Sequence, residues 1–224
     1  MKKAIFWDSD GTLLYGNESF KLSLVRAYKE LGYDLSENSA GELMHASCSW
    51  FSPDIDHSSQ SGEEWWSTLL SKFAAFGKRF GVHDGDIEKI NARFRRLAID
   101  YEYELYPDAL ETLHYFCENG WENYIISNNF PELYKVFDRL GAGKYLSGVF
   151  VSACAGYEKP RAEIFRFALE KAGTPDVCYM VGDNPVTDYI GGTNAGMKAI
   201  LVRTEPKNGE VFCKTLTEIR SLIN

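Results

Sequence analysis

Two aspartates, Asp8 and Asp10, directly follow a short apolar run near the start of the 224-residue chain. The run is long enough for one buried strand and too short for a buried helix, and the Gly11 and Thr12 that come next favour a tight turn. Carboxylates held this close repel each other unless a cation bridges them or one of them keeps its proton. The pair therefore suits Mg²⁺ binding or general acid catalysis, and simple capping of a turn is the alternative.

Polar side chains also follow other predicted strands. Ser127, with Asn128 and Asn129 behind it, ends a strand predicted at 123–127, where a hydroxyl and free backbone amides can hold a phosphoryl group. Asp183 ends a strand predicted at 177–182, and Asp188 lies in the first turn of the helix expected after it. Ordinary turns and helix starts use the same residue types, so each signal alone leaves a structural explanation open.

Lys159 precedes Pro160, and proline suits the first position of a helix predicted at 160–172. Lys159 is then expected at the amino end of that helix, where the macrodipole disfavours a cation. A residue placed where its charge opposes stability is typical of a functional site. The alternative is that Lys159 is a solvated surface lysine.

Strands and helices alternate through the second half of the chain. Predicted strands at 123–127, 148–152, 177–182 and 198–202 are separated by helices at 108–119, 131–140 and 160–172 and by one more short helix. Such alternation with short connections predicts a parallel sheet covered on both faces, and the first apolar run must join it to find a partner. The expected fold class is therefore α/β, a Rossmann-like doubly wound sheet. Ligands bind at the carboxyl edge of such sheets, where all these polar residues would gather.

The segment between the first strand and residue 100 has a different character. It reads as several amphipathic helices with no strand among them, which predicts a separate helical bundle above the carboxyl edge. The expected division is a core of residues 1–15 and 101–224 and a helical insertion of residues 16–100. Hinges between the two are expected near 14–16 and 101–106.

Composition limits the partners. Acidic residues outnumber basic ones by 32 to 24, which argues against nucleic acid or an anionic membrane as the main partner. The five cysteines form no CxxC pair, and Asp8 interrupts the only apolar run near the amino end, so we expect reduced thiols, no zinc site, no secretion signal and no membrane span. These features predict a cytoplasmic protein. We expect a monomer or weak homo-oligomer, although no sequence feature determines the oligomeric state.

The four motifs together resemble the haloacid dehalogenase-like (HAD) hydrolase superfamily. They are DxDGT at 8–12, the strand-ending Ser127, Lys159-Pro160 and GDxxxxD at 182–188, in that order. The helical insertion after the first strand resembles subfamily I with its C1-type α-helical cap. A doubly wound nucleotide-binding protein is an alternative with the same fold class. No GxGxxG or GxxxxGK stretch follows a strand, which argues against it.

The resemblance implies a role for each motif residue. Asp8 would be the nucleophile that forms an aspartyl phosphate, and Asp10 would protonate the leaving oxygen and then activate water. Ser127, with the amide of Asn128, would hold phosphoryl oxygens, and Lys159 would neutralise charge on the nucleophile and the phosphate.

The resemblance also implies a Mg²⁺ site. The carboxylate of Asp8, the backbone carbonyl of Asp10 and the carboxylate of Asp183 would bind the ion, with Asp188 supporting them. The ion would remove the repulsion between a carboxylate and a phosphate dianion.

Asp10 also helps to choose among the reactions of the superfamily. Relatives that dehalogenate 2-haloacids lack this aspartate and need no Mg²⁺. Phosphonate-cleaving relatives use a cap lysine and sugar-phosphate mutases use cap cations, but residues 33–71 contain no Lys or Arg, although Lys72 and Lys78 follow. The favoured function is a Mg²⁺-dependent phosphatase acting on a small phosphorylated metabolite. Another HAD chemistry, or a non-catalytic protein that binds a phosphoryl ligand, is the alternative.

The same cation-free stretch suggests a substrate class. It carries seven carboxylates, so a neutral or cationic leaving group is expected if this stretch faces the site. Trp50, Phe51, His45 and His57 are candidate substrate contacts. Helix periodicity places Trp65 and Trp66 in the core and four arginines mainly on solvated faces, namely Arg79, Arg93, Arg95 and Arg96.

Overall fold

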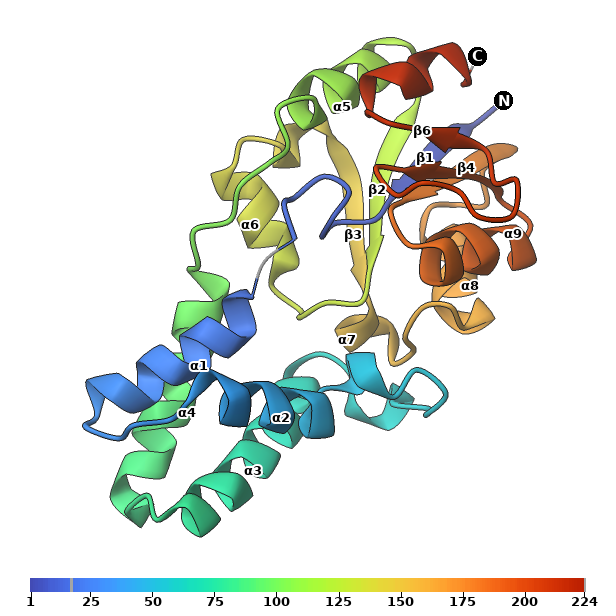
Figure 1. The fold of residues 1–224 in the computed structure, drawn as a ribbon. Coiled ribbons are helices and arrows are strands. Elements are labelled where there is room, and N and C mark those ends of the chain that lie inside the picture. Colours follow the sequence, from blue (N-terminus) through green and yellow to red (C-terminus); the bar gives the residue numbers. More distant parts are fainter. Residues whose placement is uncertain (17, 224) are drawn as a thin grey trace.

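A six-stranded parallel sheet forms the centre of the molecule (Figure 1). The structure is a computed structural model that describes residues 1–16 and 18–223. The strand order is β3-β2-β1-β4-β5-β6. The strands are β1 (Lys3–Trp7), β2 (Glu122–Ser127), β3 (Leu146–Val151), β4 (Val177–Gly182), β5 (Lys198–Val202) and β6 (Phe212–Cys213). The predicted α/β fold with a doubly wound parallel sheet is confirmed.

Strand β1 shows why both faces of the sheet are covered. Ile5 and Trp7 belong to one apolar cluster and Ala4 and Phe6 to another, since successive side chains of a strand point to opposite faces. Helices α5 (Ala109–Glu118) and α6 (Leu133–Arg139) contribute buried residues to the first cluster, and α8 (Ala162–Lys171) contributes to the second. The nearly continuous apolar character of β1 is therefore that of a central parallel strand.

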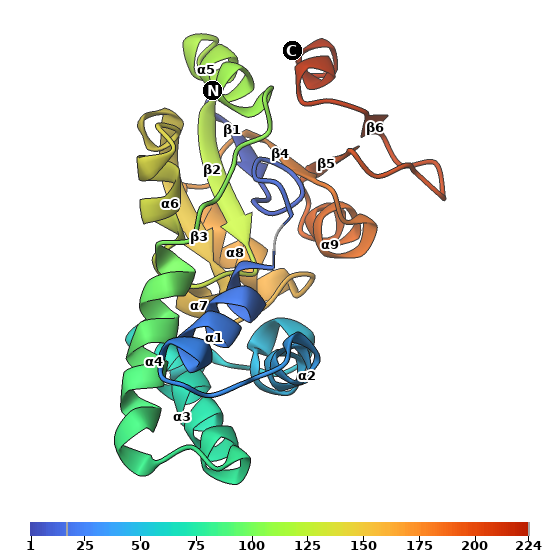
Figure 2. The same ribbon diagram turned by 60° about the vertical axis from the view of Figure 1, so that its left-hand side comes forward.

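Four longer helices form a layer beyond the carboxyl ends of the strands (Figures 1 and 2). They are α1 (Ser19–Glu30), α2 (Glu37–Ser47), α3 (Glu63–Phe80) and α4 (Asp84–Ile99), and we call residues 18–100 the helical segment. Short 3₁₀ turns at Ser49–Phe51 and Ser58–Gln60 connect α2 to α3. The predicted absence of strands holds for the described residues of this segment.

Aromatic side chains make the core of the helical segment. Phe20 stacks on Trp66 with ring centroids 5.9 Å apart, and Phe73 packs against Phe94 at 5.2 Å. Trp65 and Trp66 are buried, which confirms their assignment to the core. No helix among the described residues combines the length and apolar character that crossing a membrane requires.

The chain passes between the sheet and the helical segment along two neighbouring connections. The backbone N–H of Tyr15 donates to Glu104 at 3.0 Å, and that of Tyr106 donates to Leu13 at 2.9 Å. The rings of Tyr15 and Tyr106 lie 4.0 Å apart. The expected hinge residues therefore run side by side in opposite directions.

The structure corrects the prediction around Lys159. Helix α8 begins at Ala162, so Pro160 is not its first residue and Lys159 is not in its first turn. The backbone N–H of Arg161 closes a turn onto the carbonyl of Glu158 at 3.0 Å, and this turn accommodates the proline before the helix begins. Further short elements complete the chain: a 3₁₀ turn at Gly143–Tyr145, α7 (Ser152–Ala155), a π-helix at Pro185–Ile190, α9 (Gly191–Asn194) and a 3₁₀ turn at Thr217–Ser221.

Candidate active site

Strand register brings the motif residues together. Trp7 on β1 pairs with Ile125 on β2 and with Val181 on β4. The residues two positions further along, Ser9, Ser127 and Asp183, therefore leave the sheet at the same level, although they are far apart in sequence. Asp8 continues the pairing through its backbone N–H, which donates to Val181 at 2.8 Å.

Lys159 joins two of the motif carboxylates. Its Nζ donates to Asp8 Oδ1 and to Asp188 Oδ1, both at 2.6 Å. The three residues are only 3%, 7% and 1% exposed, respectively, so water screens these ion pairs weakly. Lys159 is thus a buried cation, and the alternative of a solvated surface lysine is wrong.

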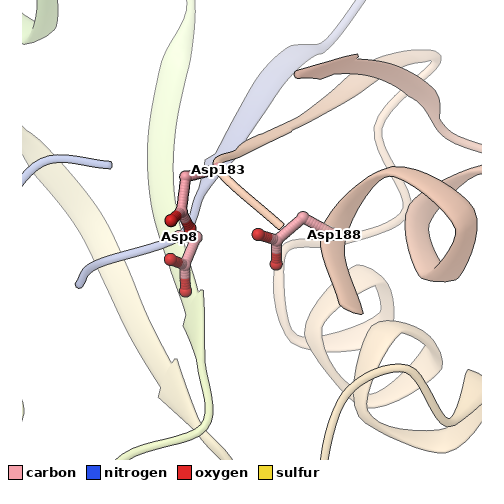
Figure 3. A group of neighbouring side chains, drawn as sticks. All are labelled: Asp8, Asp183 and Asp188. Carbon is pink, nitrogen blue, oxygen red and sulfur yellow. The ribbon is translucent and has the colours of Figure 1, made fainter. Parts of the chain in front are cut away.

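Asp183 completes an acidic cluster at this point. Asp8, Asp183 and Asp188 each offer a carboxylate oxygen, and these oxygens lie within 4.8 Å of one another. Figure 3 shows Asp8 arriving from the end of β1 and Asp183 and Asp188 from the segment after β4, with the Asp188 carboxylate turned toward the other two. The carboxylate of Asp10 is not part of the cluster. The expected metal ligand from Asp10 is its backbone carbonyl, and that contribution stays a prediction.

Burial and mutual repulsion make this cluster electrostatically unfavourable without a further cation. Burial raises the pKa of Asp8, Lys159 opposes this, and the carboxylates of Asp188 and Asp183 add to the rise. Burial, followed by the charge of Asp188, raises the pKa of Asp183 to about 6. Burial disfavours the charge on Lys159, but Asp188 and Asp8 together raise the pKa of this ammonium. One ammonium cannot balance three carboxylates, so the site favours binding of an additional cation.

The local backbone is adapted to the cluster. Gly11 has a φ of +85°, and a Cβ built there would lie 2.4 Å from Asp183 Oδ2. Only glycine therefore lets the loop after β1 approach this carboxylate. The ligand atoms are all oxygens, as a hard divalent cation such as Mg²⁺ prefers, and the residues present fit such an ion.

A hydrogen-bonded network orients the carboxyl of Asp10. Ser9 Oγ donates to Asp10 Oδ2 at 2.8 Å, and Asn129 Nδ2 donates to the same oxygen at 2.7 Å. Ser9 Oγ also lies 2.7 Å from Ser127 Oγ. Sequence reasoning singled out neither Ser9 nor the side chain of Asn129, although the position of Ser9 between two aspartates was a usable signal.

Asn128 holds Lys159 in place. The backbone N–H of Lys159 donates to Asn128 Oδ1 at 2.6 Å, and Asn128 Nδ2 donates to the carbonyl of Lys159 at 3.1 Å. The resemblance had implied a role for the backbone amide of Asn128 only. The side chain adds a direct link between the end of β2 and the lysine.

A cavity of about 510 Å³ lies between these residues and the helical segment. Asp10, Asn128, Asn129 and Asp183 line its sheet side. The residues that line its helical side include Phe20, Lys21, Met44, Trp50 and Phe51. A comparably large hollow between α3 and α4 contains none of the motif residues.

The residues that line the cavity do not include the carboxylates from which the sequence analysis argued for a substrate class. None of the seven carboxylates at 33–71 lines it, because that stretch presents Gly41, Met44, Trp50 and Phe51 instead. His45 stacks on Phe51 with ring centroids 4.5 Å apart, and neither His45 nor His57 is among the lining residues.

Several cations of the helical segment are paired with carboxylates. Lys21 at the cavity wall pairs with Glu18 at 2.5 Å and with Glu37 at 3.3 Å. Arg93 pairs with Glu30, and Arg95 with Glu63, outside the cavity. The helical side of the cavity is therefore largely apolar and carries a compensated charge.

Comparisons with known proteins agree with this arrangement. The family model for haloacid dehalogenase-like hydrolases matches residues 2–196. The chain is 30% identical over 217 residues to a glyceraldehyde 3-phosphate phosphatase of Methanothermobacter thermautotrophicus, covering 94% of this chain and 89% of the relative. It is 28% identical over 207 residues to a ribulose-1,5-bisphosphate 5-phosphatase of Halopiger xanaduensis, covering 90% and 84%.

Solved structures show the same fold. The HAD-hydrolase YfnB from Bacillus subtilis, solved bound to magnesium, superposes with a TM-score of 0.75 at 18% identity and covers 100% of this chain and 99% of its own. A 2-haloacid dehalogenase from Pseudomonas syringae superposes equally well, at 17% identity and with 100% and 98% coverage. With motif residues gathered at one sheet edge and a family match over most of its length, the chain belongs to the haloacid dehalogenase-like hydrolases.

Proposed function

We propose that this protein is a Mg²⁺-dependent phosphomonoester hydrolase that acts on a small phosphorylated metabolite through an aspartyl phosphate on Asp8. The observation that carries the proposal is the Lys159 ammonium, 2.6 Å from both Asp8 and Asp188, beside the Asp183 carboxylate. A buried site with this charge distribution suits a phosphoryl group that arrives together with a metal ion. The phosphatases among the curated relatives support the same reaction class.

Asp8 would attack the phosphorus atom of the bound substrate. As the bond from the Asp8 oxygen to phosphorus forms, the bond to the leaving oxygen breaks and its electron pair stays on that oxygen. Asp10, which lines the cavity, would supply the proton that the leaving oxygen takes up. Lys159 would favour the ionised form of Asp8, and Ser127 with the backbone amide of Asn128 would hold the phosphoryl oxygens.

Hydrolysis of the aspartyl phosphate would use Asp10 again. As a carboxylate after the first step, Asp10 would take a proton from a water molecule that attacks phosphorus. The bond from phosphorus to the Asp8 oxygen then breaks, its electron pair returns to Asp8, and inorganic phosphate leaves. Both aspartates end in their starting protonation states, so the cycle is balanced.

Asp8, Asp183 and the backbone carbonyl of Asp10 would hold the Mg²⁺ ion. Asp188 already accepts hydrogen bonds at both oxygens, from Lys159 at 2.6 Å and from the backbone N–H of Asn184 at 3.0 Å, which supports a positioning role. When bound, Mg²⁺ would supply the positive charge that lets a carboxylate approach a phosphate dianion.

Competing reactions of the family fit less well. Phosphonate cleavage and mutase chemistry need a cationic side chain in the helical wall of the cavity. Among the described residues that line this wall, the cation is Lys21, and it is paired with two glutamates. Asp10 argues against 2-haloacid dehalogenation, which needs no acid at that position. The dehalogenase structure shares the fold at 17% identity, which carries no information on the reaction.

The cavity also supports a substrate class. The described residues of its helical wall include Phe20, Met44, Trp50 and Phe51 and no uncompensated cation, so we propose a monophosphate whose leaving group has no net charge. Matched comparison of kcat/KM for glycerol phosphate and a sugar bisphosphate tests this. A clear preference for the bisphosphate would contradict the proposal.

The helical segment would then act as a C1-type cap. We assign residues 1–15 and 101–224 to the catalytic core and residues 16–100 to the cap, with hinges at the paired connections near 14–16 and 101–106. Reduced thiols, supported by five cysteines free of disulfides, favour a cytoplasmic location.

Hydrolysis of 4-nitrophenyl phosphate with Mg²⁺, and after its removal with EDTA, tests the reaction. We expect Mg²⁺-dependent turnover that Asp8→Asn abolishes while the thermal midpoint changes little. Turnover by Asp8→Asn at the wild-type rate would exclude the covalent mechanism. Phosphate binding without turnover in the wild type would favour the non-catalytic alternative.

A further inference from the structure

Ser9 occupies a position from which it contacts two residues of the proposed mechanism. Its side chain is fully buried, and its Oγ lies 2.8 Å from Asp10 Oδ2 and 2.7 Å from Ser127 Oγ. Asp10 and Ser127 come from different strand ends. A single small hydroxyl therefore bridges the proposed general acid and the proposed phosphoryl ligand.

Asn129 reaches the same oxygen of Asp10 with a defined orientation. The Asn129 Oδ1 atom accepts a hydrogen bond from the backbone N–H of Phe130 at 3.0 Å, which identifies the other side-chain atom as the amide nitrogen. That nitrogen donates to Asp10 Oδ2 at 2.7 Å and approaches Ser9 Oγ at 3.3 Å. The donor side chains Ser9 and Asn129 are buried, whereas Asp10 is partly exposed at the cavity, so water competes little for these donors.

We propose that Ser9 and Asn129 are positioning residues that fix the carboxyl of Asp10 through two hydrogen bonds to Oδ2. This inference rests on the proposed function and adds to it the side chains that orient the acid. An oxygen that accepts hydrogen bonds from Asn129 and from Ser9 is poorly placed to carry a proton of its own. The proton for the leaving group is therefore carried by Oδ1.

The orientation matters in the first chemical step. The oxygen of the leaving group gains the electron pair of the breaking bond to phosphorus and takes the proton from Asp10 Oδ1, which leaves Asp10 as a carboxylate. A carboxyl that rotates freely is correctly aligned for only part of the time. Esters with a poor leaving group depend most on this proton, because their leaving oxygen is the more basic.

The dependence on leaving group tests the proposal. We would measure kcat/KM with Mg²⁺ for phenyl phosphate, a poor leaving group, and 4-nitrophenyl phosphate, a good one. For Ser9→Ala we expect a loss of roughly 10–100-fold with phenyl phosphate and less than about threefold with 4-nitrophenyl phosphate. Weaker phosphate binding through Ser127 would lower both values by the same factor, so only the ratio reports on Asp10.

Two further variants make the test specific. Asn129→Ala removes the second donor and should change the ratio in the same direction. In an Asp10→Ala background, Ser9→Ala should leave the ratio unchanged, since no acid remains to be positioned. Ser23→Ala removes a buried hydroxyl in α1, remote from the network, and should behave as the wild type.

Crystal structures separate this proposal from the proposed function. In the Ser9→Ala/Asn129→Ala protein we expect the Asp10 carboxyl to rotate away from its wild-type orientation, whether or not the enzyme turns over. An unchanged Asp10 carboxyl in that protein, or an equal loss with both esters for Ser9→Ala, would overturn the positioning role. A wild type without Mg²⁺-dependent hydrolysis would count against the proposed function, and the orientation of Asp10 would still decide the role of Ser9 and Asn129.

Discussion

Ser49 in the helical segment donates a hydrogen bond of 2.5 Å to Glu158, the residue directly before Lys159. Trp65 donates to the same Ser49 hydroxyl at 3.0 Å, so the aromatic core of the helical segment is linked to the lysine turn. Backbone bonds add to this contact, because His57 donates to Gly156 at 2.9 Å and Gly62 to Ala153 at 2.7 Å. The helical segment and the sheet therefore meet next to the proposed catalytic lysine.

Glu158 should make stability depend on pH. Burial raises its pKa above the ordinary 4.5, although hydrogen bonds from Ser49 and Ser152 and the charge of Lys159 act in the opposite direction. A raised pKa means that stability from the neutral carboxyl is fully present below pH 4.5 and is lost as pH rises through the folded-state pKa. Glu158→Gln should therefore gain stability relative to the wild type as pH rises. Thermal midpoints across pH measure this, with exposed Glu102→Gln as control; parallel curves would refute it.

Asn128→Ala should misplace Lys159. The variant removes both hydrogen bonds between the Asn128 side chain and the lysine backbone, so the ammonium loses a fixed anchor. A drop in kcat/KM of roughly 10–100-fold is expected, the scale of an ångström-level displacement in an active site. The exposed Asn119→Ala serves as control in the same aryl phosphate assay. Full activity of Asn128→Ala would show that the turn at 158–161 holds the lysine unaided.

Gly11→Ala should weaken metal binding. A Cβ at this position meets Asp183 Oδ2 at 2.4 Å, and the backbone there has a φ that alanine rarely adopts. Displacement of Asp183 is expected to lower Mg²⁺ affinity by roughly 10–100-fold, as read by calorimetry or by the Mg²⁺ dependence of the thermal midpoint. Gly85→Ala, in an open helical position of α4, is the matched control. Equal Mg²⁺ affinities of the wild type, Gly11→Ala and Gly85→Ala would contradict the role of Asp183 as a metal ligand.

Arg203 should stabilise the loop after β1. Its guanidinium carbon lies 3.5 Å from the ring centroid of Tyr106, its Nε donates to the carbonyl of Thr12 at 3.1 Å, and it pairs with Asp108 at 2.6 Å. Arg203→Ala should cost about 1–3 kcal/mol of unfolding free energy. Arg203→Lys should recover little of it, because an ammonium cannot reproduce the planar contacts.

Denaturant titration measures the effect of these Arg203 variants. The exposed Arg96, which pairs with Asp100 at 3.6 Å, is the control, and Arg96→Ala should cost less than about 1 kcal/mol. Equal losses for Arg203→Ala and Arg96→Ala would contradict the role assigned to Arg203.

Sequence patterns determined the architecture of this protein. The strands predicted at 177–182 and 198–202 match β4 and β5, because short apolar runs bounded by turn residues and alternating with helices are typical of strands in a covered parallel sheet. The same logic located Asp8, Ser127 and Asp183, since a residue type at a strand end is local information. Lys159 was selected for a reason that the structure corrects, because the proline after it lies in a turn before α8 and not at the first position of the helix.

Tertiary structure decided how side chains meet. The bridge from Ser9 to Ser127 depends on the register of β1 against β2, and the hold of Asn128 on Lys159 joins two segments that no periodicity connects. The carboxylates at 33–71 were counted correctly but do not line the cavity, since packing of the aromatic core sets how each helix is turned. Sequence thus determines which groups are present at each strand end, and long-range packing, which no local pattern encodes, determines which of them touch.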